Sequence, residues 1–333
     1  MSRPFIASAS AFLSAATFSV ALWATLFLHL GLARAAEPRR LTFDGRVKTA
    51  PRFVDGGKSL IYSVQTRYNQ LSLLKLAVDV ADVDGPAPPA TREAAIVAAG
   101  QLVHPAASTS ELAPALSADD RVFAYVRNNG NLHVALVIED RLHSRTTEVD
   151  PGGGFAGIQY VDVSPDGRRV VYAFPDKAGG GQQLISVGVD GQDKRTLTAG
   201  DEFDSSPRYS RDGRQLAFAS TRPGNFDVFV MTSDGQDVRR LTRFSGIDLH
   251  PTWSPDGRRI AYSSLRDGNF DIYVRDAAHD ADAVDAVDLV SDVRLTTHPE
   301  RDDYPVWHPD GRHLATVSER DGRHDLYLWT LPP

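Results

Sequence analysis

The chain has 333 residues with 26 glycines, 20 prolines and no cysteine, and its formal net charge is −7 at pH 7. The lack of cysteine excludes disulfides, so export of the chain would not depend on oxidative cross-linking. An acidic chain of this size is poorly suited to nucleic acid, whose phosphates favour clusters of Lys and Arg, and no nucleic-acid partner is expected.

The amino-terminal segment has the three parts of a secretory signal peptide. Met1-Ser-Arg-Pro is basic, an apolar stretch runs from Ala11 to Leu32, and Ala33-Arg-Ala35 offers an Ala-x-Ala cleavage site. We therefore expect a signal peptide over residues 1–35 and a periplasmic or secreted mature chain over residues 36–333. The apolar stretch is also long enough to remain as an uncleaved membrane anchor, which is the alternative.

A repeated turn motif organises the rest of the chain. The sequence Ser-Pro-Asp-Gly-Arg-Arg begins at Ser164 and again at Ser254, and looser copies occur on both sides of each. The aspartate position of this turn marks six repeats that are 44 to 63 residues apart: Gly56, Asp119, Asp166, Asp212, Asp256 and Asp310. A period of about 45 residues is typical of a four-stranded propeller blade.

Each repeat contains the same pattern of strands. Apolar residues alternate around the Asp-Gly turn, a second hairpin follows, and a short outer strand such as Arg239-Arg-Leu-Thr ends the unit. The last repeat lacks an outer strand, whereas an orphan copy, Arg39-Arg-Leu-Thr, stands before the first repeat. We therefore predict an all-β, six-bladed β-propeller of four-stranded blades, closed by an amino-terminal strand that completes the last blade.

Several of these motifs together resemble a known repeat family. The Ser-Pro-Asp-Gly turn, the Asp-x-x-Pro lead-in at Asp204–Pro207 and the Arg-Arg-Leu-Thr strand resemble the repeat of TolB-type β-propellers over about residues 38–330. TolB itself carries an α/β domain before its propeller. The resemblance therefore implies a TolB-like protein that consists of the propeller only.

Acidic residues occupy the same place in the last three repeats. Asp204, Asp248 and Asp302 each stand three residues before the strand that we expect to be innermost in its blade. Radial repetition would gather their carboxylates at one mouth of the axial channel, where they could hold a hard cation such as Ca²⁺. Alternatively, each aspartate caps its own turn through hydrogen bonds to the backbone. Glu111, at the equivalent position of the second repeat, and His250 are candidates for a partner-binding rim.

Three functions are compatible with this sequence, one of them a small-ligand sensor in which a cation has only a structural role. The main interpretation is an exported, non-catalytic binding or scaffold propeller whose partner is an envelope or periplasmic protein, because the sequence contains no Gly-x-Ser-x-Gly nucleophile elbow and no His-x-x-x-His pair. The alternative is a metal-dependent lyase or lactonase, with a divalent cation in the axial channel and His250, Asp248 or Asp204 nearby. Oligogalacturonide lyases are similar to such a propeller in general fold, although fold does not imply function.

Overall fold

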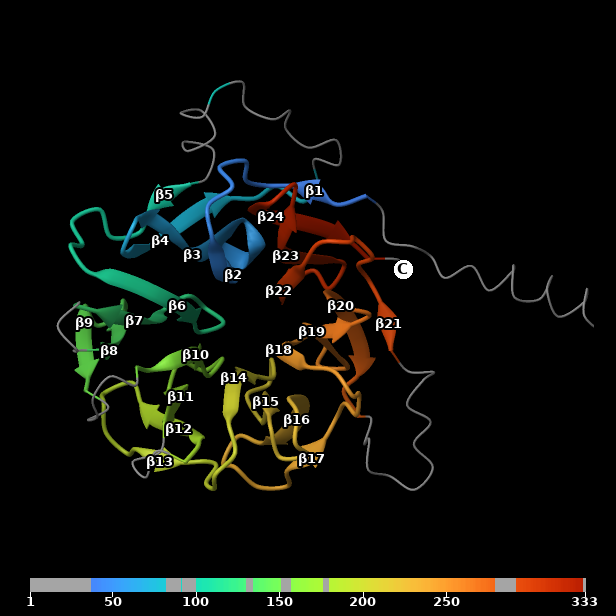
Figure 1. Cartoon of the computed structure of the whole chain (residues 1–333). Helices are drawn as coiled ribbons and strands as arrows, with labels where there is room; N and C mark the ends of the chain where they lie inside the picture. Colours follow the sequence, from blue (N-terminus) through green and yellow to red (C-terminus); the bar gives the residue numbers. More distant parts are fainter. Residues whose placement is uncertain are drawn as a thin grey trace, which may run out of the picture. The chain divides into compact units, whose positions relative to one another are not determined.

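The computed structural model describes residues 37–81, 91, 100–129, 134–150, 157–175, 180–278 and 292–331. These residues form six four-stranded antiparallel sheets arranged as blades around an axis (Figure 1). The predicted six-bladed, all-β propeller is thereby confirmed. The predicted signal peptide, residues 1–35, lies outside the described residues. Within the described ranges, no helix is long and apolar enough to span a bilayer.

The first three blades follow one another along the chain, each from its innermost to its outermost strand. Blade 1 consists of β2 (Lys48–Val54), β3 (Ser59–Arg67), β4 (Gln70–Ala77) and β5 (Gln101–Leu102), with a 3-10 turn, η1 (Asp55–Gly57), between β2 and β3. Blade 2 consists of β6 (Ser110–Leu116), β7 (Val122–Asn128), β8 (Val134–Asp140) and β9 (Arg145–Val149). Blade 3 consists of β10 (Gln159–Val163), β11 (Arg169–Pro175), β12 (Gln182–Gly188) and β13 (Arg195–Thr196).

The last three blades continue in the same order. Blade 4 consists of β14 (Asp204–Tyr209), β15 (Gln215–Ser220), β16 (Asp227–Thr232) and β17 (Arg239–Arg240). Blade 5 consists of β18 (Asp248–Trp253), β19 (Arg259–Arg266), β20 (Asn269–Asp276) and β21 (Val293–Arg294). Blade 6 consists of β22 (Asp302–Trp307), β23 (His313–Arg320), β24 (Arg323–Thr330) and β1 (Arg39–Arg40).

The ring is closed by β1, which comes from the start of the described chain and pairs with β24 near its end. Arg40 Nη2 lies 2.5 Å from Asp325 Oδ2, and the Thr42 hydroxyl donates a hydrogen bond to Asp325 Oδ1 over 2.7 Å. Lys48 of blade 1 approaches the same Oδ1 to 3.2 Å, and its side chain is fully buried. The predicted closure is confirmed, and Asp325 joins the two ends of the ring.

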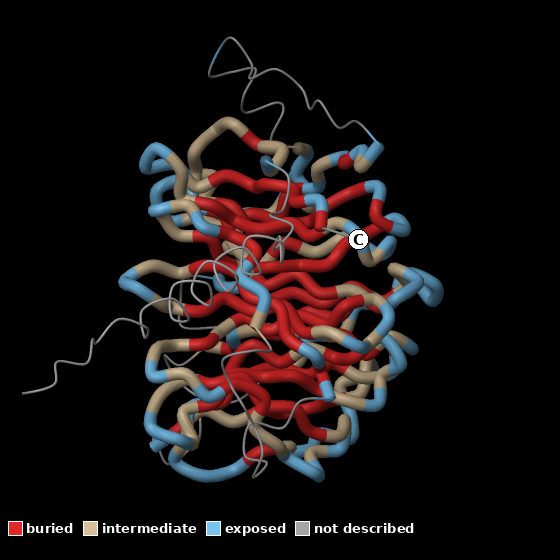
Figure 2. Tube along the Cα trace, turned by 90° about the vertical axis from the view of Figure 1, so that its right-hand side faces the viewer, coloured by how far each residue is buried: buried red, intermediate tan, exposed pale blue. Residues whose placement is uncertain are grey.

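The core consists of six apolar clusters, one at each junction between neighbouring blades. At the junction of blades 4 and 5, for example, Trp253 packs with Val228 and Tyr262. Figure 2 shows the buried segments running through the sheets, with the exposed residues gathered in the loops. Packing therefore fixes each blade against its two neighbours and leaves the loops at both ends of the axis accessible.

Every innermost strand carries a β-bulge. The pairing with the next strand shifts register at one point in each blade, and the residue at that point is a non-glycine residue in the left-handed region, with φ between 51° and 53°. The six residues are Ala50, Ala113, Tyr160, Ser206, His250 and Tyr304. Left-handed backbone costs about 1–2 kcal/mol for such a residue. Bulges often re-aim side chains near functional sites, so these six positions direct attention to the axis.

Candidate functional site

Aromatic side chains from three bulges meet across the axis. The rings of His250 (blade 5) and Tyr304 (blade 6) stack with their centroids 4.1 Å apart, and Tyr160 of blade 3 lies 5.7 Å from His250. Blades 3 and 5 are not neighbours, because blade 4 lies between them in the ring, so the contact between Tyr160 and His250 reaches across the axial channel. The bulges therefore turn these side chains inward, toward one another.

His250 is oriented by a buried carboxylate. Its Nδ1 lies 2.7 Å from Asp303 Oδ1, which also accepts a hydrogen bond from the Ser263 hydroxyl over 2.6 Å. Burial alone would raise the pKa of Asp303, but the charge and hydrogen bond of His250, together with Arg301, hold that pKa well below its usual range. The His250 Nε2 atom is buried and has no hydrogen-bond partner. A histidine oriented by an acid in this way has the geometry of a general base.

A cavity of about 190 Å³ lies on the axis, toward the carboxyl-terminal ends of the innermost strands and the turns that follow them. All six blades contribute to its lining. Aromatic side chains line one part of the cavity: Phe53, Tyr209, Trp253 and Trp307. We refer to this cavity as the axial pocket. Its charged lining residues are Arg52, Asp162, Arg208 and Arg211.

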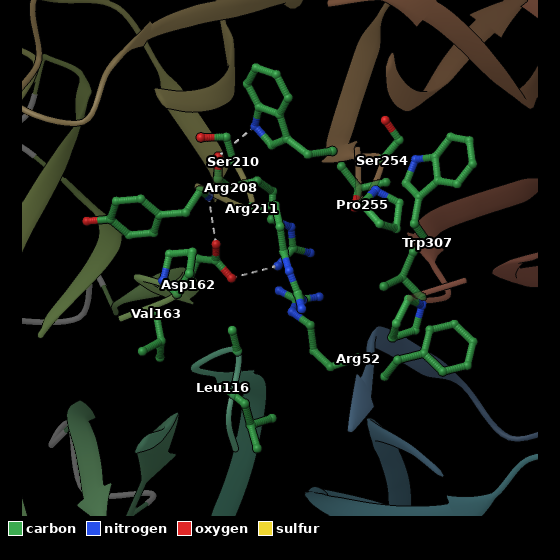
Figure 3. A pocket seen from close by; sticks show the side chains of 18 residues that line it. Arg52, Leu116, Asp162, Val163, Arg208, Ser210, Arg211, Ser254, Pro255 and Trp307 are labelled. Atoms are coloured by element: carbon green, nitrogen blue, oxygen red, sulfur yellow. Dashed lines mark hydrogen bonds and ion pairs between the residues drawn. The ribbon is translucent and has the colours of Figure 1, made fainter. Parts of the chain in front are cut away.

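The arginines of the axial pocket gather beside one carboxylate (Figure 3). Arg52 extends from blade 1 to donate a hydrogen bond to the Val161 carbonyl of blade 3, over 3.4 Å. Arg208 Nη1 is 3.5 Å from Asp162 Oδ1, and Asp162 Oδ2 accepts the Tyr209 amide at 2.8 Å. Arg52 and Arg208 come from opposite blades, and both extend to the same strand, β10 of blade 3, so their guanidinium groups meet in the pocket.

Burial shifts the pKa values of both kinds of group in the pocket. It raises the pKa of Asp162 to about 6, although Arg52 and backbone hydrogen bonds oppose the shift. It lowers the pKa of Arg52 to about 10, so this side chain stays charged at neutral pH. The lining therefore holds three arginines and one carboxylate, and the raised pKa of that carboxylate lets it take up a proton in mild acid. The lining is positively charged overall.

Asp204, Asp248 and Asp302 are the first residues of β14, β18 and β22, so they lie at the opposite ends of these strands from the axial pocket. Asp204 forms a two-pronged ion pair with Arg222, with distances of 2.7 and 2.9 Å. Asp248 and Asp302 are fully buried, and none of their carboxylate oxygens has a hydrogen-bond partner. In the described part of the chain, no hydrogen bond or ion pair joins any two of the three, and the predicted Ca²⁺ site stays a prediction.

The two rim candidates are both buried and paired. Glu111 is 4% exposed and accepts a hydrogen bond from His104 Nδ1 over 2.8 Å, while His104 Nε2 lies 3.3 Å from Glu139. Hydrogen bonds to Glu111 and then Glu139 raise the pKa of His104 to about 9. His250 is 5% exposed. The role of Glu111 and His250 in partner binding stays a prediction.

One group in the described part of the chain has the composition of a metal site. His308, Asp310 and His313 place their ligand atoms within 4.8 Å of one another, in the turn after β22. Asp310 Oδ2 lies 3.0 Å from His308 Nδ1 and 2.7 Å from His313 Nδ1. In other blades a serine and an aspartate pair in this turn, as Ser254 and Asp256 do over 2.5 Å. These contacts therefore account for the group as a hydrogen-bonded turn.

Asp303 and the charged residues of the axial pocket were not among the site residues predicted from the sequence. Arg52, Asp162 and Arg208 occupy one column of the repeat, two residues after the bulge. The other blades have Ala115, Thr252 and Val306 in that column. Charged residues are unusual at this equivalent position of the repeat, because the innermost strands are mostly buried. Their occurrence in three of the six repeats could have indicated a functional site.

Residues 199–292, which include all of blade 4, match the family model of the TolB beta propeller domain. The repeats within these residues are therefore similar to those of TolB propellers. No curated protein sequence matches the chain. Two TolB structures have similar folds: one from Agrobacterium tumefaciens (18% identity, 86% of this chain and 91% of that chain, TM-score 0.58) and one from Acinetobacter baumannii (20% identity, 83% and 65%, TM-score 0.54).

An enzyme shares the fold as well. An oligogalacturonate lyase in complex with manganese is 17% identical, with 85% of this chain and 76% of that chain covered and a TM-score of 0.51. Identities this low show similarity of fold alone. The TolB-like propeller of this chain therefore has structural neighbours among both TolB proteins and lyases, and its own site residues must support any choice of function.

Proposed function

We propose that this chain is an exported, non-catalytic binding propeller whose partner is an envelope or periplasmic protein that docks over the axial pocket. The single observation that carries this proposal is the lining of the pocket by Tyr209, Trp253, Trp307 and arginines. Trp, Tyr and Arg are the residue types that dominate binding energy at protein interfaces. The signal-peptide pattern and the similarity to TolB structures support the envelope location.

The size of the axial pocket also favours a protein partner. Pockets that enclose a whole small-molecule ligand usually measure about 300–1,000 Å³. At about 190 Å³, the axial pocket is large enough for one side chain of a larger partner. The partner's remaining contacts would then lie on the surrounding turns.

Site-specific photo-crosslinking tests this proposal. A photoreactive residue is placed at Arg211, which is exposed and lines the pocket, or at Leu142, which is 65% exposed and lies in blade 2 beyond β8. Both variants are exported in the source cell and irradiated. We expect one envelope or periplasmic protein to be crosslinked from position 211 and not from position 142. Equal crosslinking from both positions, or none from position 211, contradicts the proposal.

A metal-dependent lyase or lactonase is the second candidate. The His250–Asp303 pair, with its free and buried His250 Nε2, favours it because the pair could accept a proton from a substrate in the axial channel. The test is turnover of oligogalacturonate and of simple lactones, with Mn²⁺ or Ca²⁺ added. Activity lost in His250→Gln and retained in Arg214→Gln, a change at an exposed turn, would support the enzyme. Equal rates in the wild type and His250→Gln would refute it.

A further inference from the structure

The axial pocket has an excess of positive charge that the protein leaves uncompensated. Among the described residues, its lining holds three arginines, Arg52, Arg208 and Arg211, and a single carboxylate, that of Asp162. The distance of 3.5 Å between Arg208 Nη1 and Asp162 Oδ1 is longer than a charge-assisted hydrogen bond, which usually measures about 2.7–2.9 Å. Asp162 therefore neutralises the arginines only in part. The Nη1 and Nη2 atoms of Arg52 donate to the neutral Pro51 and Val161 carbonyls, over 2.9 and 3.4 Å, so the charge of this guanidinium is left for a second anion.

Unpaired donors in the same pocket point to an acceptor. The Nε atoms of Arg52 and Arg208 and the indole Nε1 of Trp307 are buried and have no hydrogen-bond partner. Buried donors without partners are rare in folded proteins, because each hydrogen bond that is left unmade costs free energy. Three of them in one cavity, two on guanidinium groups, match a ligand that carries negatively charged acceptor oxygens.

We infer that the axial pocket receives a carboxylate from an acidic side chain of the partner protein, held between Arg52 and Arg208. This inference rests on the proposed function and adds the chemistry of the partner. Guanidinium groups bind carboxylates through paired hydrogen bonds, which give orientation as well as affinity. The aromatic residues Trp253 and Trp307 line the same cavity and provide apolar contact for the carbon atoms of the acidic side chain.

Asp162 competes with the incoming carboxylate and makes binding depend on pH. The charged and titratable groups around it are Arg52 from β2, Arg208 and Tyr209 from β14, and Arg211 from the next turn. The pKa of Arg52 is about 10 and that of Tyr209 about 12, whereas burial raises the pKa of Asp162 to about 6. Between pH 8 and pH 5 Asp162 is therefore the group that changes charge. Protonation removes its repulsion of the ligand, and binding strengthens.

The test uses the full chain, and the probes are a capped pentapeptide with a central glutamate, the same peptide with glutamine, and inorganic phosphate. Binding is followed by tryptophan fluorescence, because Trp253 and Trp307 line the pocket. We expect the wild type to bind the glutamate peptide about tenfold more tightly than the glutamine peptide. We expect Arg52→Gln or Arg208→Gln to bind the glutamate peptide about tenfold more weakly than the wild type does. Arg145→Gln, on the exposed outermost strand of blade 2, is the control and leaves binding unchanged.

A gain of binding separates the inference from simple misfolding. Asp162→Asn is expected to bind the glutamate peptide about tenfold more tightly than the wild type at pH 8 and equally well at pH 5. Equal binding of the two peptides overturns the inference, as does an unchanged affinity in both arginine variants. Phosphate that binds more tightly than the peptide identifies a free-anion site and overturns the assignment to a side-chain carboxylate.

Failure of the inference can be told apart from failure of the proposed function. One outcome is that a partner is crosslinked from position 211 to the same extent in the wild-type background, in Arg208→Gln and in Asp162→Asn. This result supports the binding propeller and refutes the carboxylate contact. Alternatively, the glutamate peptide binds in a way that depends on Arg52 and Arg208, but no partner is crosslinked. This result supports the anion site and refutes the docking proposal.

Discussion

Replacement of Asp248 by asparagine should stabilise the folded protein at alkaline pH. Asp248 is fully buried, and although the hydroxyls of Ser264 and Thr242 are near, neither has hydrogen-bond geometry to its oxygens. Burial raises the pKa of Asp248 to about 6 from its usual 3.8. The folded state therefore binds this proton more tightly than the unfolded state does. Its contribution to stability is present below about pH 4 and is lost as the pH rises through 6.

The magnitude follows from the shift in pKa. A shift of roughly two units corresponds to about 3 kcal/mol, at about 1.4 kcal/mol per unit, which is the cost of keeping Asp248 ionised in the folded state at pH 8. Asparagine carries no charge, so Asp248→Asn should raise the free energy of unfolding by up to about 3 kcal/mol at pH 8 and change it little at pH 4. Urea unfolding followed by tryptophan fluorescence at both pH values measures this difference.

Asp204 provides the matched control, because it starts β14 as Asp248 starts β18. Its carboxylate is paired with Arg222, so Asp204→Asn should lower the free energy of unfolding at pH 8 by about 1.5–3 kcal/mol. Opposite signs for the two variants are the expected result. Equal destabilisation by both would refute the reasoning, because it would mean that Asp248 is ionised and compensated in the folded state.

The same variants test the predicted Ca²⁺ site of Asp204, Asp248 and Asp302. A cation held by these carboxylates stabilises the folded state by mass action, so added Ca²⁺ should raise the unfolding midpoint of the wild type at pH 8 and not that of Asp248→Asn. An unchanged midpoint over a Ca²⁺ titration, together with a stabilised Asp248→Asn, would contradict the site.

Three further predictions concern other parts of the propeller. Lys48→Met should lower the free energy of unfolding by about 3–5 kcal/mol, because it leaves the buried Asp325 without one of its cationic partners. Urea unfolding measures this change, and a neutral effect would refute the role of Lys48 at the ring closure. The imidazole of His104 should titrate near pH 9 by NMR, so its stabilising contribution is full below about pH 6.5 and lost as the pH rises through 9; a midpoint near 6.5 would contradict its pairing with Glu111. Ala113→Gly should stabilise the folded protein or leave its stability unchanged, since it relieves about 1–2 kcal/mol of left-handed strain, whereas Ala124→Gly in β7 should destabilise it. The same decrease in melting temperature for both variants would refute strain at the bulge.

The sequence by itself determined the blades, their number and their closure. The Asp-Gly turns, the alternation of apolar residues and the outer strands are local patterns, and local chemistry is the same in every repeat. The orphan strand at Arg39 could be recognised because it copies Arg239-Arg-Leu-Thr, and its partner Asp325 stands where Asp227 stands in blade 4. The periodicity of these local patterns was therefore sufficient to predict the fold.

Only the tertiary structure decided which side chains meet on the axis. A bulge adds one residue to each innermost strand and changes the alternation that the sequence alone would suggest, so His250 turns toward Asp303 and Tyr304, although Asp248 is nearer in sequence. Arg52 and Arg208 come from opposite blades and are neighbours only because the ring closes. Contacts across an axis depend on the positions of all six blades at once, and no local pattern encodes them.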